Sequence, residues 1–182
     1  LGKTTTMKAW GTSENESNGY LQSVEVKDKK GDYEKSLPWY RWEADIDQDI
    51  LSTLLAENVK KNIGTVQSLE VTKTGPGGVA LQIKAVGDKG SITVDTENKI
   101  RKALGGNGYE IKKQDGTVAQ SGTLLPSAFF KVKKAGNIFK ITGGGYGHGI
   151  GMSQNGANEM AKTGKNYQEI LQMFYPGTTI EK

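Results

Sequence analysis

The chain has 182 residues, 35% hydrophobic and 24% charged, so it is long enough to bury a core and has the composition of an ordinary globular domain. Its 24 Lys and Arg against 20 Asp and Glu give a net charge of +4, and the basic residues are scattered in pairs, which argues against a nucleic-acid partner. It has no cysteine, which excludes disulfides, cysteine zinc sites and thiol nucleophiles within these residues.

A strand and then a helix are predicted for the segment that ends near residue 57. Residues 39–46 alternate large and polar side chains, as in a half-buried strand. Asp45 or Asp47 can cap the helix that follows, and its apolar stripe extends to about Glu57.

A three-stranded antiparallel unit and a second helix are predicted next. Residues 68–74 and 78–87 alternate with period two around a Gly-Pro-Gly-Gly turn, which predicts a hairpin. Residues 91–95 add a third strand, and Asp95 then caps a helix that stops at Gly105.

The next segment leads to a glycine-rich loop. Residues 105–128 mix glycines with a short strand-like stretch, and we interpret them as an irregular excursion from the sheet. Residues 129–134 and 137–143 predict two more strands, joined by a turn at Ala135 and Gly136. The second of these strands runs directly into the loop.

Two helices are predicted after the loop. Ser153 can cap the first, which ends at Gly164, and the second has apolar residues at helical spacing from Tyr167 to Phe174 before Pro176. Strands and helices do not alternate as they do in a parallel α/β fold. The predicted class is therefore α+β: a mainly antiparallel sheet with several short helices, and a C-terminal glycine-rich loop followed by two helices.

The loop GGGYGHGIG surrounds His148, the only histidine of the chain. Glycine loses more conformational freedom on folding than any other residue, so this density indicates unusual backbone angles or close backbone approach. The loop lacks the third glycine of the dinucleotide fingerprint, because Ile150 stands there. Backbone N–H groups near the following helix could still stabilise negative charge. A lone histidine is usually structural, but Gly147 and Gly149 leave His148 open to a ligand.

Other residues near the loop are weaker candidates for catalysis. Ser153 lacks the last glycine of the hydrolase G-x-S-x-G elbow, so a helix cap is favoured over a nucleophile. Glu159 and Glu169 fall outside the apolar faces of their predicted helices and are interpreted as solvated charges. One imidazole without cysteines or an evident carboxylate cluster predicts no metal site.

Aromatic side chains in the first quarter of the chain could stack on sugars, although packing in a core is the more frequent role of such residues. They are Trp10, Tyr20, Trp39, Tyr40 and Trp42.

The segment GGGYGHGIGMSQNGANEMAKTGKNYQEILQMFYPGTTI resembles the C-terminal signature of the SpoIID/LytB family. The similarity includes the aromatic-Gly-His-Gly-hydrophobic-Gly-Met-Ser-Gln core at 146–154 and the Tyr-Pro-Gly-Thr at 175–178. Upstream, TTTMKAWGTSENESNGYLQSVEV is similar to a family segment that precedes a strand. Gly144 stands where many members have arginine, and Asn155 where they usually have an aromatic residue.

This resemblance implies part of a peptidoglycan lytic transglycosylase that cleaves glycan strands during sporulation and engulfment. The family's catalytic glutamate lies in an N-terminal segment with a Gly-Glu-Met-Pro-like motif, which these residues lack. We therefore expect 1–182 to be a single domain, the C-terminal part of a SpoIID/LytB domain, inactive alone and with no catalytic residue identified in it. The implied supporting residues are His148, Ser153 and Gln154, and the implied substrate-binding residues are Tyr146, Gly147, His148, Gly149 and Gly151.

Two other functions stay open, because the family also includes amidase enhancers and because a peptidoglycan-binding module need not catalyse. The expected partners are peptidoglycan glycan strands, the N-terminal segment of the same protein and other cell-wall hydrolases, with no nucleic acid, cofactor or metal. The implied location is extracytoplasmic, at the cell wall or engulfing septum, with a membrane anchor in an N-terminal segment outside these residues.

Overall fold

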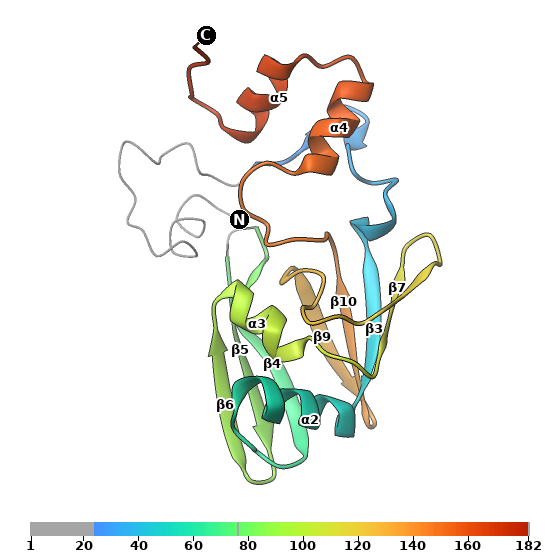
Figure 1. The fold of residues 1–182 in the computed structure, drawn as a ribbon, viewed down its shortest axis with the longest axis vertical. Coiled ribbons are helices and arrows are strands. Elements are labelled where there is room, and N and C mark those ends of the chain that lie inside the picture. The colour runs from blue at the N-terminus through green and yellow to red at the C-terminus, as the bar shows by residue number, and fades with distance from the viewer. Residues whose placement is uncertain (1–23, 76, 182) are drawn as a thin grey trace. The chain divides into compact units, whose positions relative to one another are not determined.

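The computed structural model describes residues 24–75 and 77–181, and the chain divides into two compact units. The larger unit consists of residues 38–148, and the smaller one contains the described parts of residues 1–37 and 149–182 (Figure 1). The glycine-rich loop passes from one unit to the other after His148. The expectation that 1–182 form a single domain, the C-terminal part of a larger one, stays a prediction. Trp10 and Tyr20 lie outside the described residues.

The larger unit contains a five-stranded antiparallel sheet with the strand order β8-β7-β3-β10-β9. The predicted strands at 129–134 and 137–143 are confirmed as β9 and β10. The strand predicted at 39–46 begins later, because residues Pro38–Tyr40 form a 3-10 helix first. The bounds are β3 (Trp42–Asp47), β7 (Glu110–Lys113), β8 (Val118–Gln120), β9 (Phe130–Ala135) and β10 (Ile138–Gly143).

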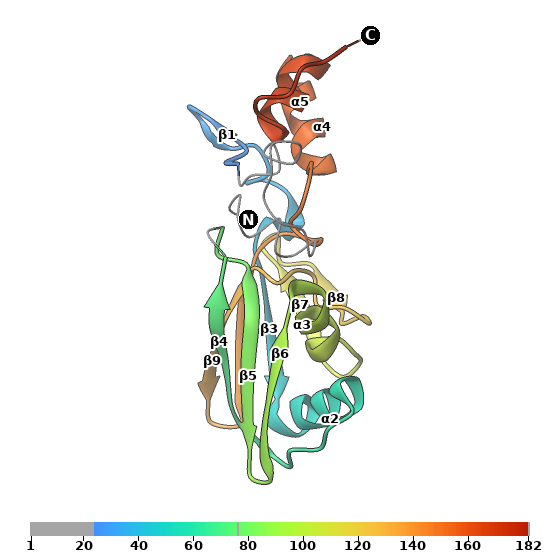
Figure 2. The same cartoon turned by 90° about the vertical axis from the view of Figure 1, so that its left-hand side faces the viewer.

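A three-stranded antiparallel sheet with the order β4-β5-β6 confirms the predicted hairpin and the strand after it. Its strands are β4 (Val66–Thr74), β5 (Ala80–Gly87) and β6 (Gly90–Asp95). Strand β4 lies beside β9, the edge strand of the larger sheet (Figure 2). Lys134 Nζ on β9 donates a hydrogen bond to Gln67 O on β4 at 3.0 Å, which links the two sheets.

Helices α2 (Gln48–Val59) and α3 (Glu97–Leu104) pack against each other; α2 also contacts β3 and β4, and α3 contacts β5 and β6. Their apolar faces meet the inward-facing side chains of the strands and form the core. Burying one large apolar side chain stabilises a fold by about 1.5–3 kcal/mol, so this core is the main source of stability in the larger unit. Its fully buried large side chains include Ile46, Leu51, Leu55, Ile83, Ile100, Leu104, Phe139 and Ile141.

The start of α2 agrees with the sequence, whereas the start of α3 does not. Asp47 is the N-cap of α2, and its carboxylate accepts a hydrogen bond from a first-turn N–H at 2.8 Å. The residue before α3 is Thr96, which has a φ of 74° and makes no side-chain capping bond. Asp95, the predicted cap, still belongs to β6 and accepts a hydrogen bond from Gln82 Nε2 at 2.7 Å. Gly105 ends the helix as predicted.

Part of the segment 105–128 is more regular than the sequence suggested. It contains the hairpin β7–β8, and β7 joins the larger sheet through the pairs Trp42 with Lys113 and Glu43 with Lys112. The prediction of an irregular excursion is therefore wrong for this part. Alternation over four residues is a weak signal, and the partner strand lies far upstream in the sequence.

A buried ion pair holds the chain after β8 against α3. Arg101 Nη1 lies 2.8 Å from Glu97 Oε1 one helical turn away, and the two side chains are only 9% and 7% exposed. Arg101 Nε also donates a hydrogen bond to Leu125 O at 2.8 Å. Buried charges are tolerated when they are paired and hydrogen-bonded, as both are here. The sequence did not indicate this pair, since the same spacing is common on exposed helix faces.

The smaller unit contains a short antiparallel pair, β1 (Lys27–Asp28) and β2 (Gly31–Asp32), and the two helices predicted after the loop, α4 (Gln154–Lys162) and α5 (Tyr167–Phe174). The two helices contact each other. The described residues thus form an α+β fold of antiparallel sheets and four α-helices, as predicted. Over the same residues, every helix is too short or too polar to cross a membrane.

Candidate functional site

The first glycine of the loop makes room for a core tryptophan. A Cβ added to Gly143 would lie 2.3 Å from Trp42 Cζ2, so any other residue there would displace the indole. Trp42 is 3% exposed, and its Nε1 donates a hydrogen bond to Gly145 O at 3.0 Å. Trp42 is therefore a core residue that anchors the loop, and it is excluded as a surface for sugar stacking.

The second glycine allows two side chains to lie close to the backbone. A Cβ added to Gly144 would lie 2.8 Å from Tyr40 O, 3.0 Å from Arg41 Nη1 and 3.3 Å from Phe129 Cδ1. The guanidinium of Arg41 also lies 3.9 Å from the centroid of the Tyr40 ring. The absence of a side chain at Gly144 thus leaves the nearby space to Arg41 and Phe129.

The later glycines have backbone angles that other residues avoid. They alternate with residues that bear side chains, so every second residue of this part lies in the left-handed region. Both needs inferred from the glycine density, close approach and unusual angles, are therefore present in one loop. The values of φ are 78° at Gly145, 143° at Gly147, 74° at Gly149 and 76° at Gly151.

Backbone hydrogen bonds fix the first half of the loop to the larger unit. The N–H groups of Gly144, Gly145 and Gly147 donate to the carbonyl oxygens of residues 129, 39 and 126 at 3.0, 2.8 and 2.9 Å. These N–H groups are the ones that a glycine-rich loop could have offered to a ligand. These three N–H groups are therefore already hydrogen-bonded within the fold.

Two such side chains lie at the surface of the larger unit. Tyr146 is 68% exposed, and its ring centroid lies 4.8 Å from that of Trp39, with the rings tilted by 45°. Lys113 Nζ lies 5.1 Å from the centroid of the Trp39 ring. His148 is exposed as well. An aromatic pair, a cation and an imidazole can together stack on a sugar ring and bind its hydroxyl groups.

The second half of the loop leads into α4 in the smaller unit. Ser153 is the N-cap of α4, and its Oγ accepts a hydrogen bond from Gly156 N at 3.1 Å. The same Oγ donates a hydrogen bond to Glu34 Oε1 at 2.7 Å. Ser153 is thus a helix cap, as the sequence favoured. Glu34 was missed, because no local pattern connects it with this loop.

The remaining residues of this half form a short turn before the helix. Met152 N donates a hydrogen bond to the hydroxyl of Tyr175 at 3.1 Å. A Cβ added to Gly151 would lie 3.5 Å from the same hydroxyl oxygen. Gly149 and Gln154 are exposed, and Gln154 is the first residue of α4.

The two carboxylates considered beside the loop are both bound to lysines. Glu159 Oε1 lies 2.6 Å from Lys162 Nζ, and its side chain is 18% exposed, so it is less solvated than predicted. Glu169 forms an ion pair with Lys165 and completes a capping box with Asn166. The hydrogen bond from Lys165 holds the pKa of Glu169 below its ordinary value, which favours the ionised form and argues against a general acid.

The described residues contain no group of three or more His, Cys, Asp or Glu side chains that could hold a metal ion. The structure brings Tyr146 together with Trp39, and Ser153 together with Glu34. No described contact brings Gln154 to either pair. The proposed roles of the loop residues in substrate binding stay predictions.

Comparisons of the sequence with known proteins show which family the chain belongs to. The chain is 30% identical to stage II sporulation protein D of Bacillus subtilis (strain 168) over 175 residues, which are 91% of this chain and 43% of that protein. It is 50% identical to the amidase enhancer of the same strain over 58 residues, 32% of this chain and 8% of that protein. It is 41% identical to an uncharacterised protein of Brachyspira hyodysenteriae over 95 residues, 51% of this chain and 26% of that protein.

Residues 7–151 match the family described as a domain of unknown function, DUF8618. The chain belongs to this family, and it is homologous to stage II sporulation protein D and the amidase enhancer of the SpoIID/LytB family, as its motifs predicted. The chain spans less than half the length of each of the relatives named above.

Proposed function

We propose that this chain is part of a peptidoglycan lytic transglycosylase that cleaves glycan strands during sporulation and engulfment. The observation that supports the proposal most is the homology to stage II sporulation protein D over 91% of the chain. The general acid is a glutamate of an N-terminal segment outside residues 1–182. The chain itself supplies the surface that binds the strand.

The reaction requires one carboxylic acid. The acid protonates the glycosidic oxygen as the bond to the anomeric carbon breaks, and the 6-hydroxyl of the same sugar closes on that carbon and gives its proton to the carboxylate that the acid has become. The oxygens of Glu34, Glu159 and Glu169 are bound to Ser153, Lys162 and Lys165 within the smaller unit. These bonds support an acid that comes from elsewhere in the protein.

In this proposal the exposed side chains of the loop contact the strand. Tyr146, backed by Trp39, stacks on a sugar ring, and His148 binds a hydroxyl or N-acetyl group. Gly147, Gly149 and Gly151 let the strand approach the backbone of the loop. Ser153 and Gln154 support the geometry at the start of α4.

An amidase enhancer is the alternative, and the 50% identity to such a protein over 58 residues favours it. The chain would then bind peptidoglycan and increase the activity of a separate cell-wall amidase. A module that only binds glycan strands would neither cleave them nor stimulate an amidase. In each case the protein acts outside the cytoplasm, at the cell wall or the engulfing septum, with a membrane anchor in its N-terminal segment.

The test compares three proteins on purified peptidoglycan strands: this chain, the chain joined to its upstream segment, and that longer protein with His148→Ala. We expect all three to bind strands, only the longer protein to cleave at full rate, and His148→Ala to reduce cleavage. Lys99→Ala, an exposed change on α3, is the control and should leave cleavage unchanged. If every form binds strands without cleaving them and stimulates an added amidase, the result would contradict the transglycosylase activity and support the role of an amidase enhancer.

A further inference from the structure

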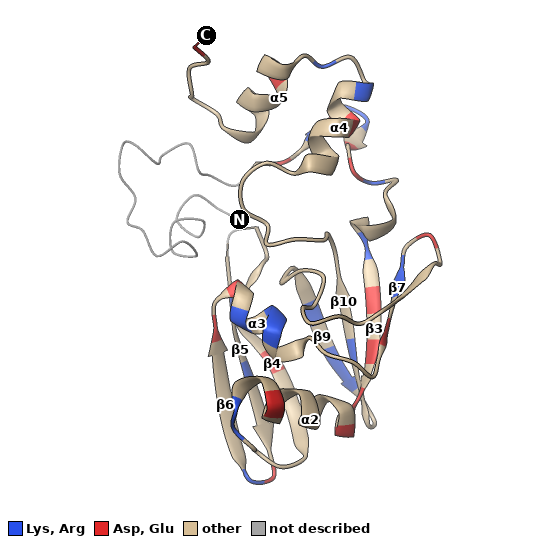
Figure 3. Ribbon diagram, in the orientation of Figure 1, with Lys and Arg blue, Asp and Glu red and all other residues tan. Residues whose placement is uncertain are grey.

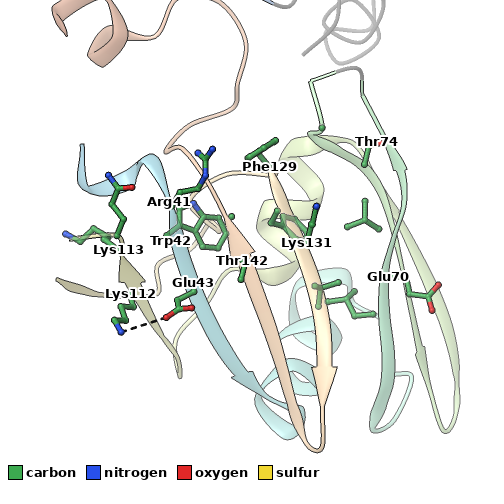
Figure 4. Close-up of a pocket in the computed structure, with 17 residues that line it drawn as sticks. Arg41, Trp42, Glu43, Glu70, Thr74, Lys112, Lys113, Phe129, Lys131 and Thr142 are labelled. Atoms are coloured by element: carbon green, nitrogen blue, oxygen red, sulfur yellow. Dashed lines mark ion pairs between the residues drawn. The ribbon is translucent and has the colours of Figure 1, made fainter. Parts of the chain in front are cut away.

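A groove runs along the strands β3, β10 and β9 of the larger unit, beside the first glycines of the loop (Figure 4). Its volume is about 1220 Å³, and all its lining residues belong to that unit. Sequence analysis did not point to it, because its residues come from separate strands. Tyr146 and His148 do not line it, whereas Lys113, which lies beside Trp39, does.

The register of three strands explains how the floor and walls of the groove arise. Thr142 on the central strand β10 lies between Glu43 on β3 and Lys131 on β9. Side chains in one row across a sheet point to the same face, and here a small residue separates two long ones. The floor is therefore low at Thr142, and the neighbouring side chains stand higher on both sides.

The row two residues further along repeats this arrangement on the same face. Gly144 lies between Arg41, which follows the 3-10 helix, and Phe129, which precedes β9. Phe129 is 39% exposed, and Arg41 is exposed too. At this end the groove has an aromatic ring on one wall and a guanidinium on the other.

The charges along the groove are unequal. Figure 3 shows acidic residues on β3 and basic residues on β9 and β10. The carboxylate of Glu43 is neutralised by two lysines, Lys112 at 3.9 Å and Lys140 at 3.4 Å. Among the described residues, Arg41 and Lys131 form no ion pair, and Arg41 Nη1 donates a hydrogen bond to the uncharged Tyr40 O at 2.7 Å, so no carboxylate neutralises either cation.

The remaining charged residues of the lining do not reverse this balance. Lys113 adds a further cation on β7. Glu70 is the second acidic residue of the lining, and it lies on β4, at the far side of the groove from Arg41 (Figure 4). The part of the groove between Arg41 and Lys131 therefore fits a negatively charged ligand.

We propose that this groove binds an acidic glycan strand, with a sugar ring against Phe129 and a carboxylate held by Arg41 and Lys131. The apolar face of a sugar packs on an aromatic ring, and a guanidinium binds a carboxylate through two parallel hydrogen bonds. The choice of a glycan over other anions rests on the proposed function. Gly143 lines the groove and begins the loop, so a strand held here lies beside the start of the loop.

Calorimetric titration of this chain with three probes tests the proposal. The probes are a hyaluronan octasaccharide, which carries carboxylates, a neutral chitin oligosaccharide of equal length, and inorganic polyphosphate. We expect the hyaluronan probe to bind at least about tenfold more tightly than either of the others. Equal binding of the neutral probe, or tighter binding of polyphosphate, would overturn the assignment to acidic glycans.

Variants test whether the binding occurs in the groove. Arg41→Gln combined with Lys131→Gln should weaken hyaluronan binding about tenfold or more and abolish the preference over chitin. The matched control is Lys99→Gln combined with Lys102→Gln, which removes the same charge from exposed positions on α3. If both pairs of substitutions weaken hyaluronan binding equally, the attraction is a general effect of charge, which would contradict binding in the groove.

The result is independent of the proposed enzymatic activity. Cleavage of peptidoglycan by the longer protein, together with equal binding of the acidic and neutral probes, would overturn the proposed ligand of the groove and support the proposed enzymatic activity. Selective binding of the acidic probe by the chain, with no cleavage by the longer protein, would support glycan binding in the groove and contradict the proposed enzymatic activity. Circular dichroism of each variant confirms that it is folded.

Discussion

Ser153 Oγ donates a hydrogen bond to Glu34 Oε1 at 2.7 Å, although 119 residues separate the two in the sequence. The same oxygen accepts the N–H of Gly156 at 3.1 Å. One hydroxyl group therefore caps α4 and ties this helix to the segment that follows β2. The end of the glycine-rich loop is fixed by this contact within the smaller unit.

Replacing Ser153 tests the contact. Ser153→Ala removes the cap of α4 and the donor to Glu34, and we expect a loss of about 1–2 kcal/mol in the free energy of unfolding. Ser153→Thr keeps the hydroxyl and should retain most of the stability. Urea unfolding measures both, and equal stability of the alanine variant and the unsubstituted protein would contradict the role of this hydroxyl.

Gly143→Ala tests whether the first loop glycine is required for packing. Its Cβ would lie 2.3 Å from the Trp42 indole, so we expect a loss of about 1–3 kcal/mol from overpacking. Gly122→Ala is a matched control, because nothing lies within 4 Å of a Cβ at Gly122 and its φ is not positive. If thermal unfolding shows the same stability for both variants, close approach to Trp42 is not the reason for the glycine.

Arg101→Met tests the buried ion pair on α3. The change leaves the Glu97 carboxylate buried without its partner, and we expect a loss of about 3–5 kcal/mol. Combining it with Glu97→Leu removes both charges and should recover part of that loss. A double variant no more stable than Arg101→Met in urea would show that the unpaired charge is not the cause.

Glu169 should make the stability depend on pH. The hydrogen bond from Lys165 and the Asn166 N–H lower its pKa below the ordinary value of 4.5 in the folded state. Its contribution is therefore complete above about pH 4.5 and is lost as the pH falls through the folded value. The difference in unfolding temperature between the unsubstituted protein and Glu169→Gln should shrink on acidification, and a difference that does not change with pH would contradict this.

Local patterns predicted much of the fold. The hairpins β4–β5 and β9–β10 follow from alternation around short turns, and Asp47 and Ser153 cap helices as their sequence context indicated. The pairing of β7 with β3 was not predictable, because it joins short strands that lie far apart in the sequence. The same limit applies to Arg101, whose burial depends on the path of the chain near Leu125.

Only the part of the candidate site that belongs to a sequence motif could be predicted. The glycine pattern identified the loop, and the family resemblance identified the relatives of the chain. Neither of them predicts the side-chain contacts around the loop. The positions of Arg41 and Phe129 around Gly144 result from three strands meeting in one sheet. Glu34 lies in a segment with no pattern of its own, and its role appears only when α4 is folded.

The central claim concerns the chemistry at the cleaved bond, so the most direct measurement is mass spectrometry of the strand ends. Attack by the sugar's own 6-hydroxyl leaves a 1,6-anhydro end, whereas hydrolysis leaves a reducing end that is heavier by one water. We expect anhydro ends from the chain joined to its upstream segment, and none from residues 1–182 alone or after Glu→Gln replacement of the upstream acid. Reducing ends only, or intact strands with every form, would contradict the claim.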